Sequence, residues 1–182
     1  MGYVAVDDVA AYVGKVKEAG GVTHRGPTEI PNVGTFAVAG DPDGAGFLIF
    51  KGNSSEAPAY EPMGLGHVGW RELNAGDGER AFAFYGGLFG WQLEEAEGTP
   101  ERYLTAKNAG ANNGGMRGLT PPSPPSWLVY FGVEDIEQAL ARLAELGGTK
   151  LVGPIDIEIA KLAVVADPQG AVFALYAGEM EP

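Results

Sequence analysis

The sequence predicts an α+β fold built from a repeated β-α-β-β-β unit, and two observations carry this prediction. Tyr3–Ile30 and Tyr130–Ile157 align without a gap, and each has a short apolar strand, an acidic pair, an amphipathic helix and a Gly-Pro step. The phrases DPDGAGFLIF at Asp41–Phe50 and DPQGAVFALY at Asp167–Tyr176 both read as a tight turn followed by an apolar strand. A phrase that recurs after two matching segments indicates that the whole unit is duplicated.

Each predicted helix begins at an aspartate and ends at a glycine pair. Asp8 and Asp135 occupy the N-cap position, where a carboxylate accepts a hydrogen bond from the first turn. Gly20-Gly21 and Gly147-Gly148 end the helices, because glycine adopts the left-handed C-terminal conformation at low cost. The apolar positions of the two helices share an i, i+4, i+7 spacing that defines one face: Val9, Val13 and Val16, and Ile136, Leu140 and Leu143.

A third, more divergent copy lies between these two, within His67–Trp91 and the residues that follow. Asp77 is its expected cap, its helix ends in GLFGW, and its last strand is expected near Met116 in or after the glycine-rich NAGANNGGMRG. The sequence therefore predicts a single unit (a half module) at 1–52, a polar, proline-bearing linker at 53–64, and a complete module at 65–179. This module contains two units, 65–119 and 126–179.

The composition narrows the classes of partner. The chain has 182 residues, a net charge of −12 and no cysteine. No basic stripe is present to neutralise phosphates, so neither nucleic acid nor an anionic membrane is expected as a partner. The absence of cysteine excludes disulfides, thiol catalysis and metal sites with cysteine ligands. Without a long apolar run or a secretory signal, we expect a cytoplasmic protein.

Paired units, the FYGGLFGW helix end, a W-x-E-L strand and DPxG before the last strand together resemble the vicinal oxygen chelate superfamily. This superfamily contains glyoxalase I, extradiol dioxygenases and bleomycin-resistance proteins. Within it, the pattern looks like the glyoxalase-like proteins related to lactoylglutathione lyase. The resemblance implies that two units pair into a curled eight-stranded cradle. In the family, the concave face of this cradle holds a divalent metal on two His and two Glu.

The ligand positions that the resemblance implies hold carbon side chains. The first position, about seven residues before each capping aspartate, is Trp70, Leu128 or Met1, and the position of the family's glutamate is Ala174 or Leu48. None of these offers a lone pair to a hard or borderline cation. We therefore expect no metal and no other cofactor, and no metal-dependent glyoxalase or dioxygenase activity.

The chain has two histidines, and His67 is the one that stands near a ligand position. It precedes Trp70 by three residues, and an odd offset along a strand points to the opposite face. We interpret His67 as an ordinary surface or hydrogen-bonding residue, with metal ligation as the alternative.

Strand alternation predicts which side chains line the cradle and bind its ligand: Trp70, Glu72, Asn74, Met116, Leu128, Tyr130, Ala174 and Tyr176. A carboxylate beside an aromatic wall could have a raised pKa and act as an acid or base, so Glu72 is a catalytic candidate, with Tyr130 as a second. The alternative is a glutamate paired with a neighbouring arginine or backbone N–H, or lying at the rim in water. The same lining also fits a filled core.

Three functions stay open. The favoured one is a protein that binds a small aromatic or cationic molecule in the cradle. The alternative is a metal-independent lyase or isomerase-type enzyme that acts on a small carbonyl or phenolic substrate with Glu72 or Tyr130. The third is a structural or regulatory module with a filled cradle.

Three units leave the first one unpaired, with an open sheet edge that favours association. Either two chains pair through their first units, or the chain begins midway through a longer ancestral protein. We expect a homodimer with Met1, Tyr3, Leu48 and Phe50 at or near the joint.

Overall fold

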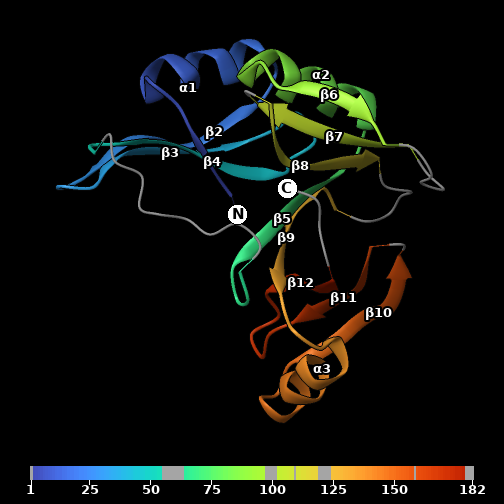
Figure 1. Cartoon of the computed structure of the whole chain (residues 1–182). Coiled ribbons are helices and arrows are strands. Elements are labelled where there is room, and N and C mark those ends of the chain that lie inside the picture. Colours follow the sequence, from blue (N-terminus) through green and yellow to red (C-terminus); the bar gives the residue numbers. More distant parts are fainter. Residues whose placement is uncertain are drawn as a thin grey trace. The chain divides into compact units, whose positions relative to one another are not determined.

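The computed structural model describes residues 2–54, 64–96, 102–108, 110–118, 124–157 and 159–178, which form three helices and twelve strands (Figure 1). The elements repeat the order β-α-β-β-β three times, so the predicted fold class is confirmed. None of the helices in the described ranges is long and apolar enough to cross a bilayer.

The first copy forms a sheet in the order β1-β4-β3-β2, in which β1 runs parallel to β4 and the other pairs are antiparallel. Its elements are β1 (Tyr3–Ala5), α1 (Val9–Glu18), β2 (Val22–Ile30), β3 (Gly34–Gly40) and β4 (Gly46–Gly52).

The second and third copies have the same internal strand orders, β5-β8-β7-β6 and β9-β12-β11-β10. The elements of the second copy are β5 (Val68–Ala75), α2 (Gly78–Phe89), β6 (Gln92–Glu95), β7 (Tyr103–Asn108) and β8 (Ala111–Gly118). Those of the third are β9 (Ser126–Gly132), α3 (Ile136–Glu145), β10 (Thr149–Ile157), β11 (Ala160–Ala166) and β12 (Val172–Gly178). The last predicted strand of the second copy therefore lies within the glycine-rich segment.

The chain divides into two compact units. The first unit comprises Met1–Ala59 and Glu72–Trp127, and the second comprises Tyr60–Arg71 and Leu128–Pro182. The first thus holds the first copy and most of the second copy, and the second unit holds most of the third copy. The predicted linker at 53–64 falls mainly outside the described residues.

All three predicted aspartate caps are present. Asp8 Oδ1 accepts a hydrogen bond from Ala11 N at 3.0 Å, and Asp77 Oδ1 accepts one from Arg80 N at 3.1 Å. Asp135 Oδ1 accepts one from Gln138 N at 2.9 Å, and this backbone bond lowers the pKa of the exposed Asp135 carboxyl.

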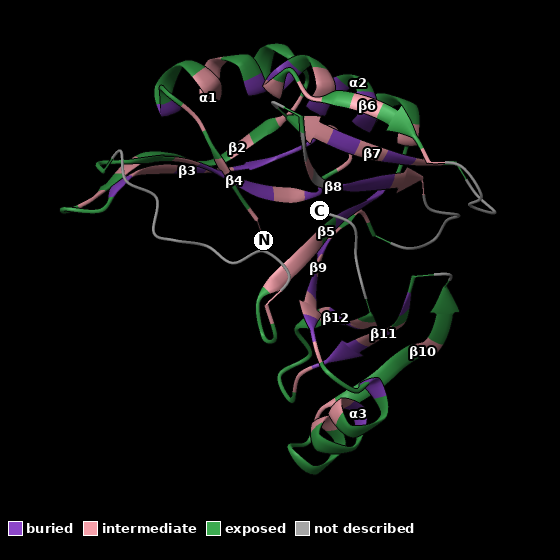
Figure 2. Ribbon diagram, in the orientation of Figure 1, coloured by how far each residue is buried: buried purple, intermediate pink, exposed green. Residues whose placement is uncertain are grey.

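In the first unit, α1 and α2 both pack on a continuous apolar core, and Figure 2 shows buried segments on β3, β4, β7 and β8. Its largest fully buried side chains include Phe47, Ile49, Tyr85 and Met116. The rings of Phe47 on β4 and Tyr85 on α2 meet edge to face with centroids 5.6 Å apart. Aromatic packing therefore joins the first copy to the helix of the second.

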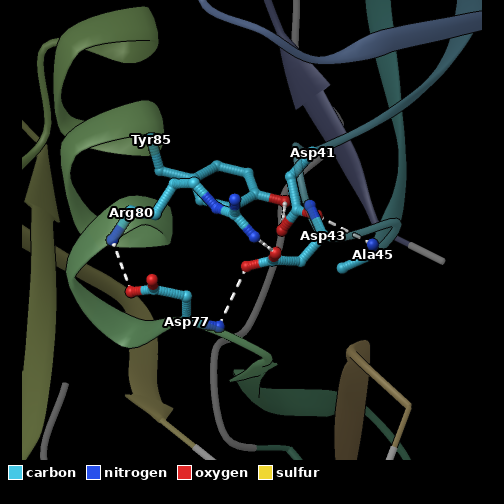
Figure 3. A network of polar contacts seen from close by, with 6 residues as sticks. All are labelled: Asp41, Asp43, Ala45, Asp77, Arg80 and Tyr85. Atoms are coloured by element: carbon cyan, nitrogen blue, oxygen red, sulfur yellow. Dashed lines mark hydrogen bonds and ion pairs between the residues drawn. The ribbon is translucent and has the colours of Figure 1, made fainter.

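A buried carboxylate joins the same two copies (Figure 3). Asp41 is 3% exposed, and its Oδ1 accepts bonds from the backbone N–H groups of Asp43 (3.0 Å) and Ala45 (2.8 Å). Its Oδ2 accepts a bond from the Tyr85 hydroxyl at 3.3 Å, and that hydroxyl accepts a bond from Trp127 Nε1 at 3.0 Å. The DPDG turn therefore both closes itself and anchors α2.

The next acidic residue of the turn reinforces this anchor. Asp43 forms an ion pair with Arg80 on α2, and its Oδ2 accepts a hydrogen bond from Asp77 N at 2.9 Å, as Figure 3 shows. In the third copy the equivalent Asp167 accepts the same two turn bonds, but its carboxylate is only partly buried. One turn sequence thus serves two different environments.

At the edge of the first sheet, Tyr3 pairs in register with Leu48, and Tyr3 contacts Phe50 edge to face at 5.9 Å. Tyr3 is 62% exposed, whereas Leu48 is buried. Met1 lies outside the described residues, and the homodimer through this edge stays a prediction.

The pH dependence of stability tests the buried anchor. Burial raises the pKa of Asp41 above its ordinary value of 3.8, although the backbone hydrogen bonds oppose this. A raised folded-state pKa contributes stability that is present below the unfolded pKa and is lost as pH rises through the folded pKa. We expect Asp41→Asn to remove this loss, so its unfolding free energy should rise relative to wild type between about pH 4 and pH 7. Urea unfolding at both pH values measures the difference.

The matched control is Asp167→Asn, which makes the same change in the same turn at a more exposed position. The difference in unfolding free energy between Asp41→Asn and wild type should change with pH. If it stays constant from acid to neutral pH, the buried Asp41 charge has no cost in stability.

Candidate functional site

The second copy presents a polar face on the side of its strands away from α2, and this side is called its inner face below. Along β5, Leu73 is fully buried in the core with α2, so Glu72 and Asn74 lie on the inner face. Strand pairing places Glu72 opposite Gly115 and Asn74 opposite Arg117 on β8. The sheet register thus brings two predicted residues beside an arginine that the sequence analysis did not single out.

Glu72, Asn74 and Arg117 form a connected cluster. Arg117 Nε donates a hydrogen bond to Asn74 Oδ1 at 2.9 Å and lies 3.3 Å from Glu72 Oε1. Glu72 and Asn74 are 6% and 7% exposed, whereas the Arg117 side chain is 40% exposed. The structure therefore has the glutamate paired with a neighbouring arginine, the alternative that the sequence left open, and the role of Glu72 as an acid or base stays a prediction.

Tyr103 on β7 completes this polar face. It is the cross-strand partner of Arg117, and its ring lies over Gly115, where a Cβ atom would overlap it. Glycine at 115 therefore provides the space that the ring occupies. Tyr103 and Arg117 are each next in sequence to a buried core residue, Leu104 and Met116. Strand alternation could therefore have indicated that both side chains point away from the core, but it could not have shown which residues they contact.

In the second unit, the side of β9, β11 and β12 away from α3 has a different chemistry. Trp70, Leu162 and Val164 are partly buried and pack on a floor of fully or nearly buried side chains, Leu128, Tyr130, Ala174 and Tyr176. We call these seven residues the aromatic face. Pairing of Ala174 with Tyr130, and of Leu162 with Tyr176, places them on one side of the strands. Five of the predicted lining residues thus come together here: Trp70, Leu128, Tyr130, Ala174 and Tyr176.

Met116 lies elsewhere than the sequence predicted. It is fully buried, pairs with Leu73, and belongs to the core that α2 covers. A shift of one residue moves a strand side chain to the opposite face, and the glycine-rich segment has no alternating pattern to define the face.

The residues present do not fit the metal that the resemblance implies. Trp70, Leu128 and Ala174 belong to the aromatic face, and Leu48 is buried, so carbon atoms occupy these positions. Within the described ranges, no group of three or more His, Cys, Asp or Glu side chains could hold a metal ion. His67 precedes β5 at an exposed position, where its backbone N donates to Gly64 O at 2.9 Å.

Comparison with known proteins gives matches to the superfamily that the sequence resembles. The family model of the Glyoxalase/Bleomycin resistance protein/Dioxygenase superfamily matches residues 64–175. The chain is 34% identical to the putative glyoxylase CFP32 of Mycobacterium tuberculosis, over 95% of the chain and 67% of that protein. It is 30% identical to the anthracycline biosynthesis protein DnrV of Streptomyces peucetius, over 95% of the chain and 63% of that protein.

Solved structures show the same fold at low sequence identity. The Mn(II)-bound glyoxalase from Novosphingobium aromaticivorans has a TM-score of 0.61 at 16% identity, over 96% of this chain and 61% of its own. The H200N variant of homoprotocatechuate 2,3-dioxygenase from B. fuscum has a TM-score of 0.62 at 17% identity, over 98% of this chain and 54% of its own. The chain thus spans about two thirds or less of the length of these four proteins.

The ion pair of the polar face makes a specific prediction for stability. Arg117→Met removes the cation beside the buried Glu72 carboxylate, and we expect it to lower the unfolding free energy by about 1–3 kcal/mol. Glu72→Gln in the same chain removes the charge and should restore most of this loss. Urea unfolding of the two single variants and the double variant gives the coupling, and additive effects would contradict the pairing.

Proposed function

Because the chain belongs to the Glyoxalase/Bleomycin resistance protein/Dioxygenase superfamily, we propose that it binds a small aromatic molecule on the aromatic face of its second unit. The observation that carries the proposal is the presence of side chains with ring and aliphatic surface where the family resemblance implies metal ligands. Trp70, Leu162 and Val164 are partly exposed above the buried rings of Tyr130 and Tyr176. Such a surface suits a planar, largely apolar ligand.

The charges of the polar face favour an aromatic over a cationic ligand. Glu72 is the buried carboxylate of this face, and its charge is already opposed by Arg117 at 3.3 Å, so it is less suited to recognise a cation. The net charge of −12 raises the concentration of cations near the surface but does not define a site for one.

The names of relatives support the same ligand class. DnrV and DauV are both named anthracycline biosynthesis proteins, and each is 30% identical to this chain. Anthracyclines contain a polycyclic aromatic ring system, and many carry an amino sugar. They therefore provide a probe in which the aromatic part and the cationic part can be separated chemically.

A second candidate function is a metal-independent lyase or isomerase reaction on a small carbonyl or phenolic substrate. The burial of the Glu72 carboxylate on the inner face, next to Asn74 and Arg117, favours it. Such a carboxylate could accept a proton from a substrate C–H or O–H group. Turnover that Glu72→Gln abolishes would support this function, and binding without turnover would support the first.

Calorimetric titration with an anthracycline and its sugar-free aglycone tests the proposed binding. We expect both compounds to bind wild type, because the ring system makes the main contact. Trp70→Ala should weaken binding of both compounds about tenfold, since it removes the partly exposed ring of the aromatic face.

Trp91→Phe is the control, because Trp91 is partly buried and packs against the core of the other unit, so its substitution should leave the affinity unchanged. Binding of the amino-sugar compound alone would indicate cation recognition. Absence of binding, or equal affinities for wild type and Trp70→Ala, would contradict the proposal.

A further inference from the structure

We propose that Arg117 is the receptor for a carboxylate group of a small molecule on the inner face of the second copy. This inference goes beyond binding at the aromatic face, because it concerns different residues in the other compact unit. It rests on the way in which the arginine is held and on the atoms that it leaves available.

The guanidinium of Arg117 is oriented from one side. Its Nε donates to Asn74 Oδ1 at 2.9 Å and lies 3.3 Å from Glu72 Oε1. Both partners are nearly buried and belong to β5, so they cannot follow the arginine into solvent. An arginine held at Nε has already lost much of its side-chain freedom, which lowers the entropic cost of binding a ligand.

The opposite side of the guanidinium is available. Among the residues that the structure describes, neither terminal nitrogen of Arg117 has a hydrogen-bond or ion-pair partner. The side chain is 40% exposed, so a small molecule can reach it. Two terminal nitrogens carry N–H groups in a planar fork, which matches the two oxygens of a carboxylate.

The surroundings favour a ring-bearing carboxylate. Tyr103 is the cross-strand partner of Arg117, and its ring lies over Gly115, which is the cross-strand partner of Glu72. Glu72 balances the charge of the arginine without using its terminal nitrogens. The chain has a net charge of −12, which repels anions. An anion therefore needs a local group of N–H donors, such as the guanidinium of Arg117, in order to bind.

Benzoate and benzamide form the test pair, because they share a ring and a similar shape but only benzoate carries a charge. Ligand-observed NMR titration at low salt measures both affinities. We expect wild type to bind benzoate at least about tenfold more tightly than benzamide. In Arg117→Gln the ratio should fall to about one, and in Arg117→Lys, which keeps the charge but loses the fork, it should be intermediate.

The double variant Glu72→Gln/Arg117→Gln guards against misfolding, because it leaves no buried unpaired charge. Arg142→Gln is the control, since Arg142 lies on α3 in an exposed pair with Glu145 and should keep the wild-type ratio. Benzoate should also shift the Nε–Hε resonance of Arg117, and benzamide should not.

Equal binding of the two probes by wild type would overturn the proposal. No detectable benzoate binding would also overturn it, as would a preference that survives in the double variant. A third outcome is that Trp70→Ala abolishes binding of the ring whereas Arg117→Gln does not. This outcome would support the aromatic-face proposal and reject the proposal for Arg117.

Discussion

The buried carboxylate of Asp41 is the constraint on which the first unit depends. It closes the DPDG turn through two backbone N–H groups and accepts the hydroxyl of Tyr85, which in turn accepts Trp127 Nε1. A carboxylate withdrawn from water is stable only when its oxygens are hydrogen-bonded, so the turn and α2 must keep this arrangement together. The position of α2 over the core then determines which sides of β5 and β8 are left as the inner face.

Repetition of a unit does not mean repetition of its chemistry. Asp41 and Asp167 close the same kind of turn, but only Asp41 is buried and contacts a helix of another copy. The inner faces differ in the same way, because the second copy presents a glutamate, an asparagine and an arginine there while the aromatic face carries rings and aliphatic groups. Duplication therefore preserved the backbone pattern and left the side chains of each face free to diverge.

Local chemistry made most of the fold predictable, whereas long-range pairing decided the site. Capping aspartates and apolar spacing located α1, α2 and α3, and alternation identified five of the seven residues of the aromatic face, all but Leu162 and Val164. The sequence predicted the wrong side of the strand for Met116, because the two glycines before it, Gly114 and Gly115, erase the alternation. Arg117 was missed because its contact with Asn74 joins residues 43 positions apart, and no local pattern specifies that register.

The pair of Glu72 and Arg117 changes how a buried carboxylate on this scaffold is interpreted. A lone glutamate on an inner face suggests proton transfer or metal binding, but each role needs lone pairs directed at a ligand. Here one carboxylate oxygen of Glu72 lies 3.3 Å from Arg117 Nε, and the same Nε donates to Asn74 Oδ1. In the proposal, the carboxylate orients the arginine, and the arginine is the group that meets the ligand. In the proposed site, the arginine would bind the oxygen atoms of a ligand through hydrogen bonds from a fixed organic cation, which needs no coordination to a metal.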